Sequence, residues 1–127
     1  MILPCLFIAP SPLRGRGVYT SEVLAKNKVI EIAPVIVMSG SDRLLLDKTL
    51  LHDYIFEWGY EKTECGMALG YVPVYNHSYT SNCEYDMDYD SALIRIKTVR
   101  RIKPGEELFV NYNGDWDDAT PLWFEAK

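Results

Sequence analysis

Short runs of apolar and β-branched residues, separated by turn residues, occur along most of the chain. The pattern is clearest where Ile94, Ile96 and Thr98 alternate with Arg95 and Lys97. A period of two residues is typical of a strand with one buried face. Similar runs predict further strands, and the expected set is 6–9, 18–19, 29–33, 35–37, 54–58, 67–71, 92–99 and 108–112. Many short strands of this kind predict a compact, mainly β domain.

Two features interrupt this strand pattern. Leucines follow Ser41 and Asp42 at near-helical spacing, at positions 44, 45, 46, 50 and 51. Because serine and aspartate cap helix N-termini, this segment predicts one short helix or 3₁₀ segment. Pro34 lacks a backbone N–H, so we expect it to interrupt the strand pattern between 29–33 and 35–37.

The composition indicates one domain. The chain has 127 residues, of which 48% are hydrophobic, and it contains neither repeats nor low-complexity segments. We therefore expect a single domain spanning 1–127. Residues 1–13 are apolar but contain three prolines and no basic residue, which fits neither a signal peptide nor a membrane span. We expect an intracellular protein, in the cytoplasm or in a host nucleus, that does not associate with membranes.

The cysteines argue against a disulfide framework. There are three of them, Cys5, Cys65 and Cys83, at unrelated spacings. An odd number leaves at least one thiol unpaired, and no Cys-x-x-Cys pair is present to bind a metal. The sequence therefore predicts reduced thiols in a reducing compartment and no metal site.

Acidic residues outnumber basic ones and give a net charge of -5. This balance argues against a phosphate-binding surface, so we expect no direct binding of nucleic acid. The acids concentrate in 84–90 and again in 115–118. These clusters are interpreted either as a solvated rim or as a field that attracts a basic peptide, and the sequence leaves both open.

Three polar motifs stand out against this background. An Asn-His-Ser sequence at 76–78 is followed by a second amide at Asn82, and a Glu-Glu-Leu-x-x-x-Tyr segment ends at Tyr112. Upstream, 14–17 reads Arg-Gly-Arg-Gly. Taken alone, the first motif is a common capped turn and the glycines suit a hairpin turn, although missing Cβ atoms would also let a ligand approach the backbone. Together, their order and spacing resemble the signature of the SET-domain lysine methyltransferases.

The resemblance implies both a fold and a cofactor. The implied fold is a β-clip of several small twisted sheets, with one short helix and a C-terminal segment that threads through as a pseudoknot. The implied cofactor is S-adenosylmethionine. The positions expected to bind it are Arg14, Arg16, Gly17, Tyr54, Asn76, His77 and Trp116.

The resemblance also implies a catalytic role for Tyr112, whose hydroxyl would lie beside the methyl group in transit. Methyl transfer to an amine mainly requires that the two partners be positioned. Desolvation in an aromatic channel favours the neutral amine, so no general base is required and we expect His77 to be structural. The expected channel residues are Tyr54, Tyr75, Tyr112 and Trp116, although Tyr54 could equally be a core aromatic. The implied substrate is a lysine in a basic protein, such as a histone tail.

Several positions depart from the family pattern. Tyr79 stands where members with a zinc-binding post-SET tail carry a cysteine, and no cysteine follows Tyr112. We therefore expect no post-SET zinc site. Ser81 replaces the usual proline and Pro73 an arginine, which puts the local backbone and one cofactor contact in doubt.

The sequence leaves two other functions open and suggests one assembly. A catalytically silent SET-like module would bind a basic peptide, and a small β-rich assembly domain would use the motifs as turns only. Without a post-SET tail, either the chain's own C-terminal segment or a second subunit must close the cofactor site. Because exposed Trp123 and Phe124 would be costly, we expect a homodimer, unless both side chains fold back onto their own core.

Overall fold

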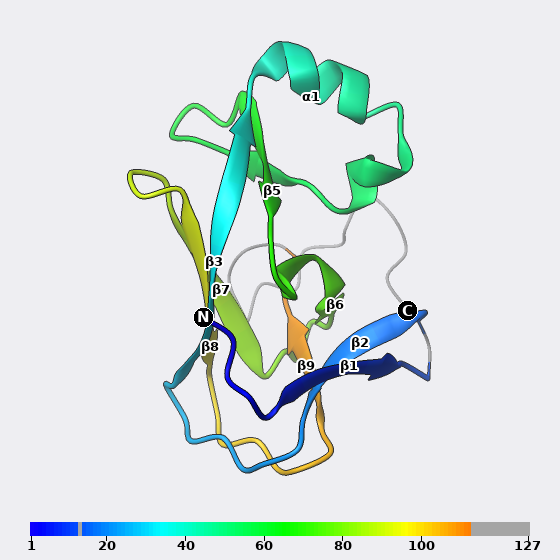
Figure 1. Ribbon diagram of the computed structural model, residues 1–127, viewed down its shortest axis with the longest axis vertical. Helices are drawn as coiled ribbons and strands as arrows, with labels where there is room; N and C mark the ends of the chain where they lie inside the picture. Colours follow the sequence, from blue (N-terminus) through cyan, green and yellow to red (C-terminus); the bar gives the residue numbers. More distant parts are fainter. Residues whose placement is uncertain (13, 113–127) are drawn as a thin grey trace.

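The structure, a computed structural model, describes residues 1–12 and 14–112. Short strands dominate this part of the chain, joined by a single α-helix and two 3₁₀ segments (Figure 1). The strands are β1 (Leu6–Pro10), β2 (Arg16–Thr20), β3 (Val29–Met38), β4 (Phe56–Trp58), β5 (Glu64–Ala68), β6 (Asn76–His77), β7 (Cys83–Asp88), β8 (Leu93–Thr98) and β9 (Glu107–Val110). The helical segments are α1 (Gly40–Leu46), η1 (Leu50–Asp53) and η2 (Val72–Val74). The prediction of a mainly β fold with one short helix is confirmed.

A four-stranded sheet contains residues of the 14–17 segment, in β2, and of the Asn-His-Ser motif, in β6. Its strand order is β1-β2-β9-β6, in which β9 is antiparallel to β2 and parallel to β6. In Figure 1, β9 (orange) lies beside β2 (blue), although the two strands are far apart in sequence. The last described strand therefore runs inside the sheet, between two earlier strands, and brings Tyr112 next to the Asn-His-Ser motif at 76–78.

A five-stranded sheet has the order β4-β5-β3-β8-β7. Its longest strand, β3, continues through Pro34, so the predicted interruption is wrong. The first part of β3 pairs with β8 up to Pro34 and Leu93, and the second part pairs with β5 from Val35 and Ala68 onward. Because β3 exchanges one partner for the other at this point, a missing N–H is tolerated there.

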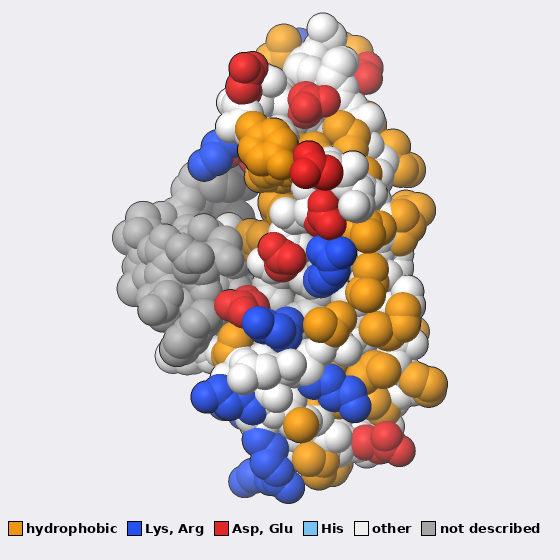
Figure 2. Space-filling model, turned by 90° about the vertical axis from the view of Figure 1, so that its left-hand side faces the viewer, with side chains coloured by type: hydrophobic (Ala, Val, Ile, Leu, Met, Phe, Trp, Pro, Cys, Tyr) orange, Lys and Arg blue, Asp and Glu red, His pale blue; other side chains and the backbone are white. Residues whose placement is uncertain are grey.

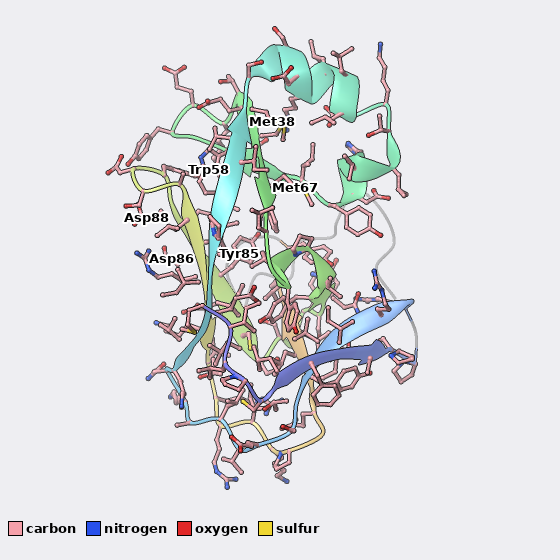
Figure 3. The ribbon with its side chains drawn as sticks, in the orientation of Figure 1. Met38, Trp58, Met67, Tyr85, Asp86 and Asp88 are labelled. Carbon is pink, nitrogen blue, oxygen red and sulfur yellow. The ribbon has the colours of Figure 1, made fainter. Side chains whose placement is uncertain are left out.

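Two other strands differ from the prediction. β5 begins at Glu64, three residues before the predicted strand 67–71, and ends at Ala68, before the residues that lead into η2. β7 was not predicted, because its acidic residues were interpreted only as a charged surface, either a solvated rim or a field that attracts a basic peptide. In the structure every second residue of β7, namely Cys83, Tyr85 and Met87, belongs to the core or packs against it, and Tyr85 and Asp86 lie on opposite sides of the ribbon (Figure 3).

The helical segment lies beyond one end of the five-stranded sheet (Figure 1). The Ser39 side chain caps α1 by accepting the Asp42 N–H at 3.2 Å, so the helix starts two residues earlier than the capping residues suggested. No residue of α1 or η1 is buried, and Leu44, Leu45 and Leu50 are 69%, 66% and 76% exposed. None of the described helices is long and apolar enough to cross a membrane.

The core lies between the two sheets and joins them. It contains β2 and β9 residues such as Val18 and Leu108, the β8 residues Ile94 and Ile96, and the ring of Tyr75. All five side chains are at most 1% exposed. The segments that carry the signature motifs are therefore anchored in the core rather than displayed on free loops.

Candidate functional site

Tyr112 is held at three atoms. Its backbone N–H donates to His77 Nδ1 at 3.0 Å, its carbonyl accepts the Tyr85 hydroxyl at 3.2 Å, and its own hydroxyl donates to the Tyr75 carbonyl at 2.8 Å. The side chain therefore has one defined direction. This is the arrangement needed by a hydroxyl that acts on a bound group.

Pairing of β6 with β9 explains why these residues meet. Asn76 pairs with Phe109 and His77 with Val110, so His77 lies two residues before Tyr112 across the parallel ladder. Asn82 fastens the other end of β9, because its amide donates to the Glu107 carbonyl at 2.9 Å and accepts the Phe109 N–H at 2.8 Å. The second amide of the motif thus holds the strand and does not face the site.

The Tyr112 phenol is neutral at ordinary pH. Its pKa is raised to about 12, mainly by burial; the Arg14 guanidinium opposes the rise and Tyr54 contributes a smaller part of it. Arg14 also donates to the carbonyl of His77, the residue whose Nδ1 accepts the Tyr112 N–H. The structure therefore brings Arg14, from the 14–17 segment, and Tyr112, which follows β9, together at His77. Tyr54, which follows η1, contributes to the electrostatics of the Tyr112 phenol.

The described contacts of His77 hold its neighbours in place. Its Nδ1 accepts the Tyr112 N–H, and burial and the Arg14 charge both lower its pKa. In this neutral tautomer Nε2 carries the proton, and that atom is buried without an acceptor among the described residues. The His77 carbonyl accepts a hydrogen bond from Arg14, so the side chain of His77 holds Tyr112 and its backbone holds Arg14.

Asn76 has its amide orientation fixed. Its Nδ2 donates to the Arg16 carbonyl at 2.9 Å and to Glu107 Oε2 at 2.8 Å. Both amide hydrogens are used, so the amide oxygen is the atom that can accept from a ligand. Glu107 is held in turn by the hydroxyls of Ser11 at 2.8 Å and Tyr19 at 3.2 Å.

The two glycines of the 14–17 segment differ. A Cβ at Gly17 would clash with the Glu107 carboxylate, whose Cδ would lie at 2.8 Å, and would be 3.1 Å from Asn76 Nδ2. The space beside Gly17 is therefore filled by the protein's own side chains. A Cβ at Gly15 would meet nothing within 4 Å, so the open backbone in this segment is at Gly15.

The geometry agrees with what known proteins show. The SET domain family model matches residues 15–113, which include the Gly-x-Gly segment, the Asn-His-Ser motif and Tyr112. The chain belongs to the SET-domain family. The resemblance drawn from the sequence is confirmed, because the match spans most of the chain.

Relatives support the same assignment for this SET domain. It is 34% identical over 123 residues to the H3 lysine-37-specific histone-lysine N-methyltransferase of Schizosaccharomyces pombe, covering 96% of this chain and 78% of the relative. A Plasmodium falciparum protein assigned as a histone methyltransferase superposes with a TM-score of 0.72 at 26% identity, covering 91% of this chain and 98% of that one. A humanised mutant of Chaetomium thermophilum Polycomb Repressive Complex 2, bound to the inhibitor GSK126, also has a TM-score of 0.72 over 87% of this chain and 15% of its own. At 18% identity, this last likeness concerns the fold alone.

Not every expected channel residue is placed as the SET signature suggested. The Tyr75 ring is 1% exposed and lies in the core, where its hydroxyl donates to Glu31 at 2.9 Å. Tyr75 therefore presents its carbonyl to Tyr112 instead of forming a channel wall with its ring. Tyr54 is 41% exposed, so a fully buried core position for it is wrong. Trp116 lies outside the described residues, and its expected packing on adenine stays a prediction.

Two residues of the SET site were missed in the sequence. Tyr85 donates to the Tyr112 carbonyl and packs edge-on against Phe56, with ring centroids 5.5 Å apart. Its alternation with Glu84 and Asp86 was the available signal. Glu107 belongs to the Glu-Glu-Leu segment, but no pattern in the sequence links its carboxylate to Asn76.

The acidic cluster of β7 is largely neutralised. Lys97 lies 3.4 Å from Glu84, and Arg95 lies 3.6 Å from Asp86 and 3.2 Å from Asp88. Figure 2 shows acidic and basic side chains near one another in the middle of this face, with basic side chains gathered below. The cross-strand pairs favour the solvated-rim interpretation for 84–88, whereas the acids at 115–118 lie outside the described residues.

Metal ligands are not grouped in this part of the SET domain. No cluster of three His, Cys, Asp or Glu side chains in 1–12 and 14–112 could hold a metal ion. Cys5, Cys65 and Cys83 all carry free thiols. The residues where a post-SET tail would follow are not described, so the expected lack of a zinc site there stays a prediction.

Proposed function

We infer that this SET domain is a protein-lysine methyltransferase that modifies the side-chain amine of lysine in a basic protein. The observation that carries the function is the hydroxyl of the half-buried Tyr112, which is neutral and donates to the Tyr75 carbonyl at 2.8 Å. It lies beside the Asn-His-Ser strand in a chain that belongs to the SET-domain family. A hydroxyl oxygen and a carbonyl oxygen directed together suit a polarised methyl group.

We propose S-adenosylmethionine as the cofactor, and three observations support the fit. The Asn76 amide oxygen is available to accept a hydrogen bond from an ammonium group. Gly15 leaves open backbone in the 14–17 segment, and the buried His77 Nε2 lacks an acceptor among the described residues. Arg14, Arg16, Gly17, Tyr54, Asn76 and His77 would hold the cofactor, with Trp116 as a further candidate. When bound, this cofactor supplies a methyl group on a positively charged sulfur.

The residues around Tyr112 have separable roles. Tyr112 keeps its proton at the hydroxyl, because its pKa of about 12 lies far above neutral pH, and directs that proton to the Tyr75 carbonyl. In this orientation we expect the oxygen lone pairs to face the reacting groups. We propose that Tyr54, Tyr85 and Tyr112 line the lysine path, where aromatic faces admit the stem and attract the charged head. Desolvation along such a path favours the neutral amine that the reaction requires.

The substrate is a basic protein, and we propose a histone. The fission-yeast relative is named for lysine 37 of histone H3, and this chain carries a net charge of -5. The test is to incubate the purified chain with S-adenosylmethionine and recombinant core histones and to map modified lysines by mass spectrometry. A mass increase of one or more methyl groups on lysine supports the proposal. An intracellular location, in the cytoplasm or a host nucleus, stays a prediction.

Calorimetry distinguishes this function from the two noncatalytic alternatives. Both the silent peptide-binding module and the assembly domain predict weak or no binding of S-adenosylmethionine. The Asn76 amide favours the enzyme. Both of its hydrogens are bonded within the protein, so its oxygen alone is presented to a ligand, as a site for the cofactor's ammonium group requires. Absence of binding heat for the cofactor, in a folded preparation, would contradict the enzymatic proposal.

We also propose that the chain forms a homodimer. The expected contact residues Trp123 and Phe124 lie outside the described residues. Separate support comes from Leu44, Leu45 and Leu50, which are mostly exposed on α1 and η1 although burial would stabilise them. Sedimentation at micromolar concentration tests this: a single species of 14.6 kDa, with specific activity independent of enzyme concentration, would contradict the dimer.

A further inference from the structure

The carboxylate of Glu31 is buried, and no Lys, Arg or His side chain in the part of the chain that the structure describes forms an ion pair with it, although the Met1 ammonium acts on it electrostatically. Glu31 is 0% exposed and lies in β3, where the pairing with β8 shifts register between Val29 and Glu31. This irregularity makes Ile30 and Glu31 both face the interior, although consecutive strand residues ordinarily face opposite sides. Burial raises the pKa of Glu31, which opposes its ionisation, and hydrogen bonds to its oxygens offset part of this effect.

The two oxygens of Glu31 hold the two ends of one short segment. Oε2 accepts the Tyr71 N–H at 2.7 Å, and Oε1 accepts the Tyr75 hydroxyl at 2.9 Å. The segment between them is η2, in which the Val74 N–H donates to the Tyr71 carbonyl at 2.8 Å. Gly70 precedes it with φ at +71°, and a Cβ there would clash with the Glu31 carboxylate. The turn is therefore built around the carboxylate.

The last residue of this segment, Tyr75, contacts Tyr112. Tyr75 is anchored in the core by its ring and by its hydroxyl, and its carbonyl accepts the Tyr112 hydroxyl at 2.8 Å. Glu31, Tyr75 and Tyr112 thus form a continuous path from a buried carboxylate to the hydroxyl of the site. The Tyr75 ring lies in the core and does not line the lysine path, and its hydroxyl is bonded to Glu31.

We propose that Glu31 is a positioning residue for methyl transfer, which clamps the 71–75 turn and thereby fixes the carbonyl that orients the Tyr112 hydroxyl. This proposal rests on the function inferred for Tyr112. The Tyr75 hydroxyl is the link between the carboxylate and the carbonyl. Glu31 itself touches neither substrate nor cofactor.

The physical reason is rotational freedom. A phenolic hydroxyl turns about its C–O bond unless an acceptor holds its proton, and its lone pairs turn with it. The Tyr75 carbonyl is such an acceptor, but it lies at the junction of a 3₁₀ turn with a strand of only two residues. Without the Glu31 clamp, the turn can shift, and a small displacement of a positioned group reduces turnover more than binding.

The test uses Tyr75→Phe, which removes one oxygen atom and keeps the core ring. The nine tyrosines are labelled with ¹³C at Cζ, and the Tyr112 signal is assigned by its loss in Tyr112→Phe. In the cofactor-free protein, we expect Tyr75→Phe to shift or broaden the Tyr112 signal. Turnover should fall by about three- to tenfold, the effect of one hydrogen bond, while KM for a histone peptide changes less than about twofold.

Glu31→Gln is the second variant and keeps the side-chain shape. A glutamine can accept from the Tyr71 N–H with its oxygen, but it presents an amide donor to the Tyr75 hydroxyl. We therefore expect the Tyr112 signal to move in the same direction as in Tyr75→Phe. Thr98→Val is the control, since it removes a buried hydroxyl that bonds to Ala25 and Lys28, outside the path. It should lower stability without moving the Tyr112 signal.

The outcomes separate this proposal from the methyltransferase function. If Tyr75→Phe and Glu31→Gln leave the Tyr112 signal and turnover unchanged, or if Thr98→Val changes them equally, the positioning role is overturned. If the Tyr112 signal moves but the wild-type protein methylates no lysine, the path is supported and the proposed function fails. Loss of stability alone, with unchanged turnover, would reduce Glu31 to a structural residue.

Discussion

Replacing Asn76 by aspartate tests the contact on which the proposed cofactor site depends. Asn76 Nδ2 lies 2.8 Å from Glu107 Oε2, and Asn76→Asp would place a second carboxylate against the first. Two negative charges about 3–4 Å apart repel by about 1–5 kcal/mol for effective dielectric constants between about 80 and 20. Because Asn76 is only half-buried, we expect the lower part of this range, about 1–3 kcal/mol.

The matched control is Asn76→Ala, which removes the same two hydrogen bonds without adding charge. Both variants should weaken cofactor binding by about 1–3 kcal/mol. The aspartate variant should lose about 1–3 kcal/mol more free energy of unfolding than the alanine variant at about pH 7.5. Urea denaturation of the two variants and the wild type measures this difference.

The repulsion between the two carboxylates determines how the stability difference between the aspartate and alanine variants changes with pH. A pair of close carboxyls has a raised pKa in the folded protein, so the folded state binds a proton that the unfolded chain lacks. The extra loss of stability is therefore present at high pH and disappears as pH falls through the raised pKa toward about 4. Equal stabilities of the aspartate and alanine variants at every pH would show that Asn76 does not adjoin Glu107.

Three other predictions follow from the described residues. Gly17→Ala should displace the Glu107 carboxylate and lower stability by about 1–3 kcal/mol, whereas Gly15→Ala should change stability little, as urea denaturation can show. The lowered pKa of His77 means that the unfolded chain binds a proton before the folded protein does, so stability should fall as pH drops below about 6.5, by at most about 1.4 kcal/mol per pH unit. His77→Gln should reduce this fall of stability with pH. An identical pH dependence in the variant and the wild type would contradict a lowered pKa for His77. Metal analysis of the purified chain should find no stoichiometric zinc, and one equivalent would overturn the predicted lack of a post-SET site.

Local patterns in the sequence predicted the strands that have one face in the core. The alternation around Ile94 and Ile96 is an example, because both side chains are fully buried in β8. The same alternation in β7 was overlooked, because its acidic residues suggested a charged surface. Pro34 was misinterpreted since the sequence does not reveal that β3 changes partners there.

Only the site residues that belong to recognisable sequence motifs could be predicted. Asn76, His77 and Tyr112 were identified by their order and spacing, and the β6–β9 pairing brings them together. The contacts of Glu31 and Glu107 were beyond reach, because each depends on long-range pairing or on a register shift that local composition does not determine. Glu31 and Glu107 position other residues of the site through hydrogen bonds, and no sequence motif marks them for this role.

The central claim is that the Tyr112 hydroxyl acts where the methyl group is transferred. Tyr112→Phe removes this hydroxyl and leaves the His77 and Tyr85 bonds to the Tyr112 backbone in place. Calorimetry and turnover on the same histone substrate are compared with an active wild type. We predict a Kd for S-adenosylmethionine within about twofold of wild type and a loss of turnover of at least about tenfold. Turnover at the wild-type rate would contradict the account.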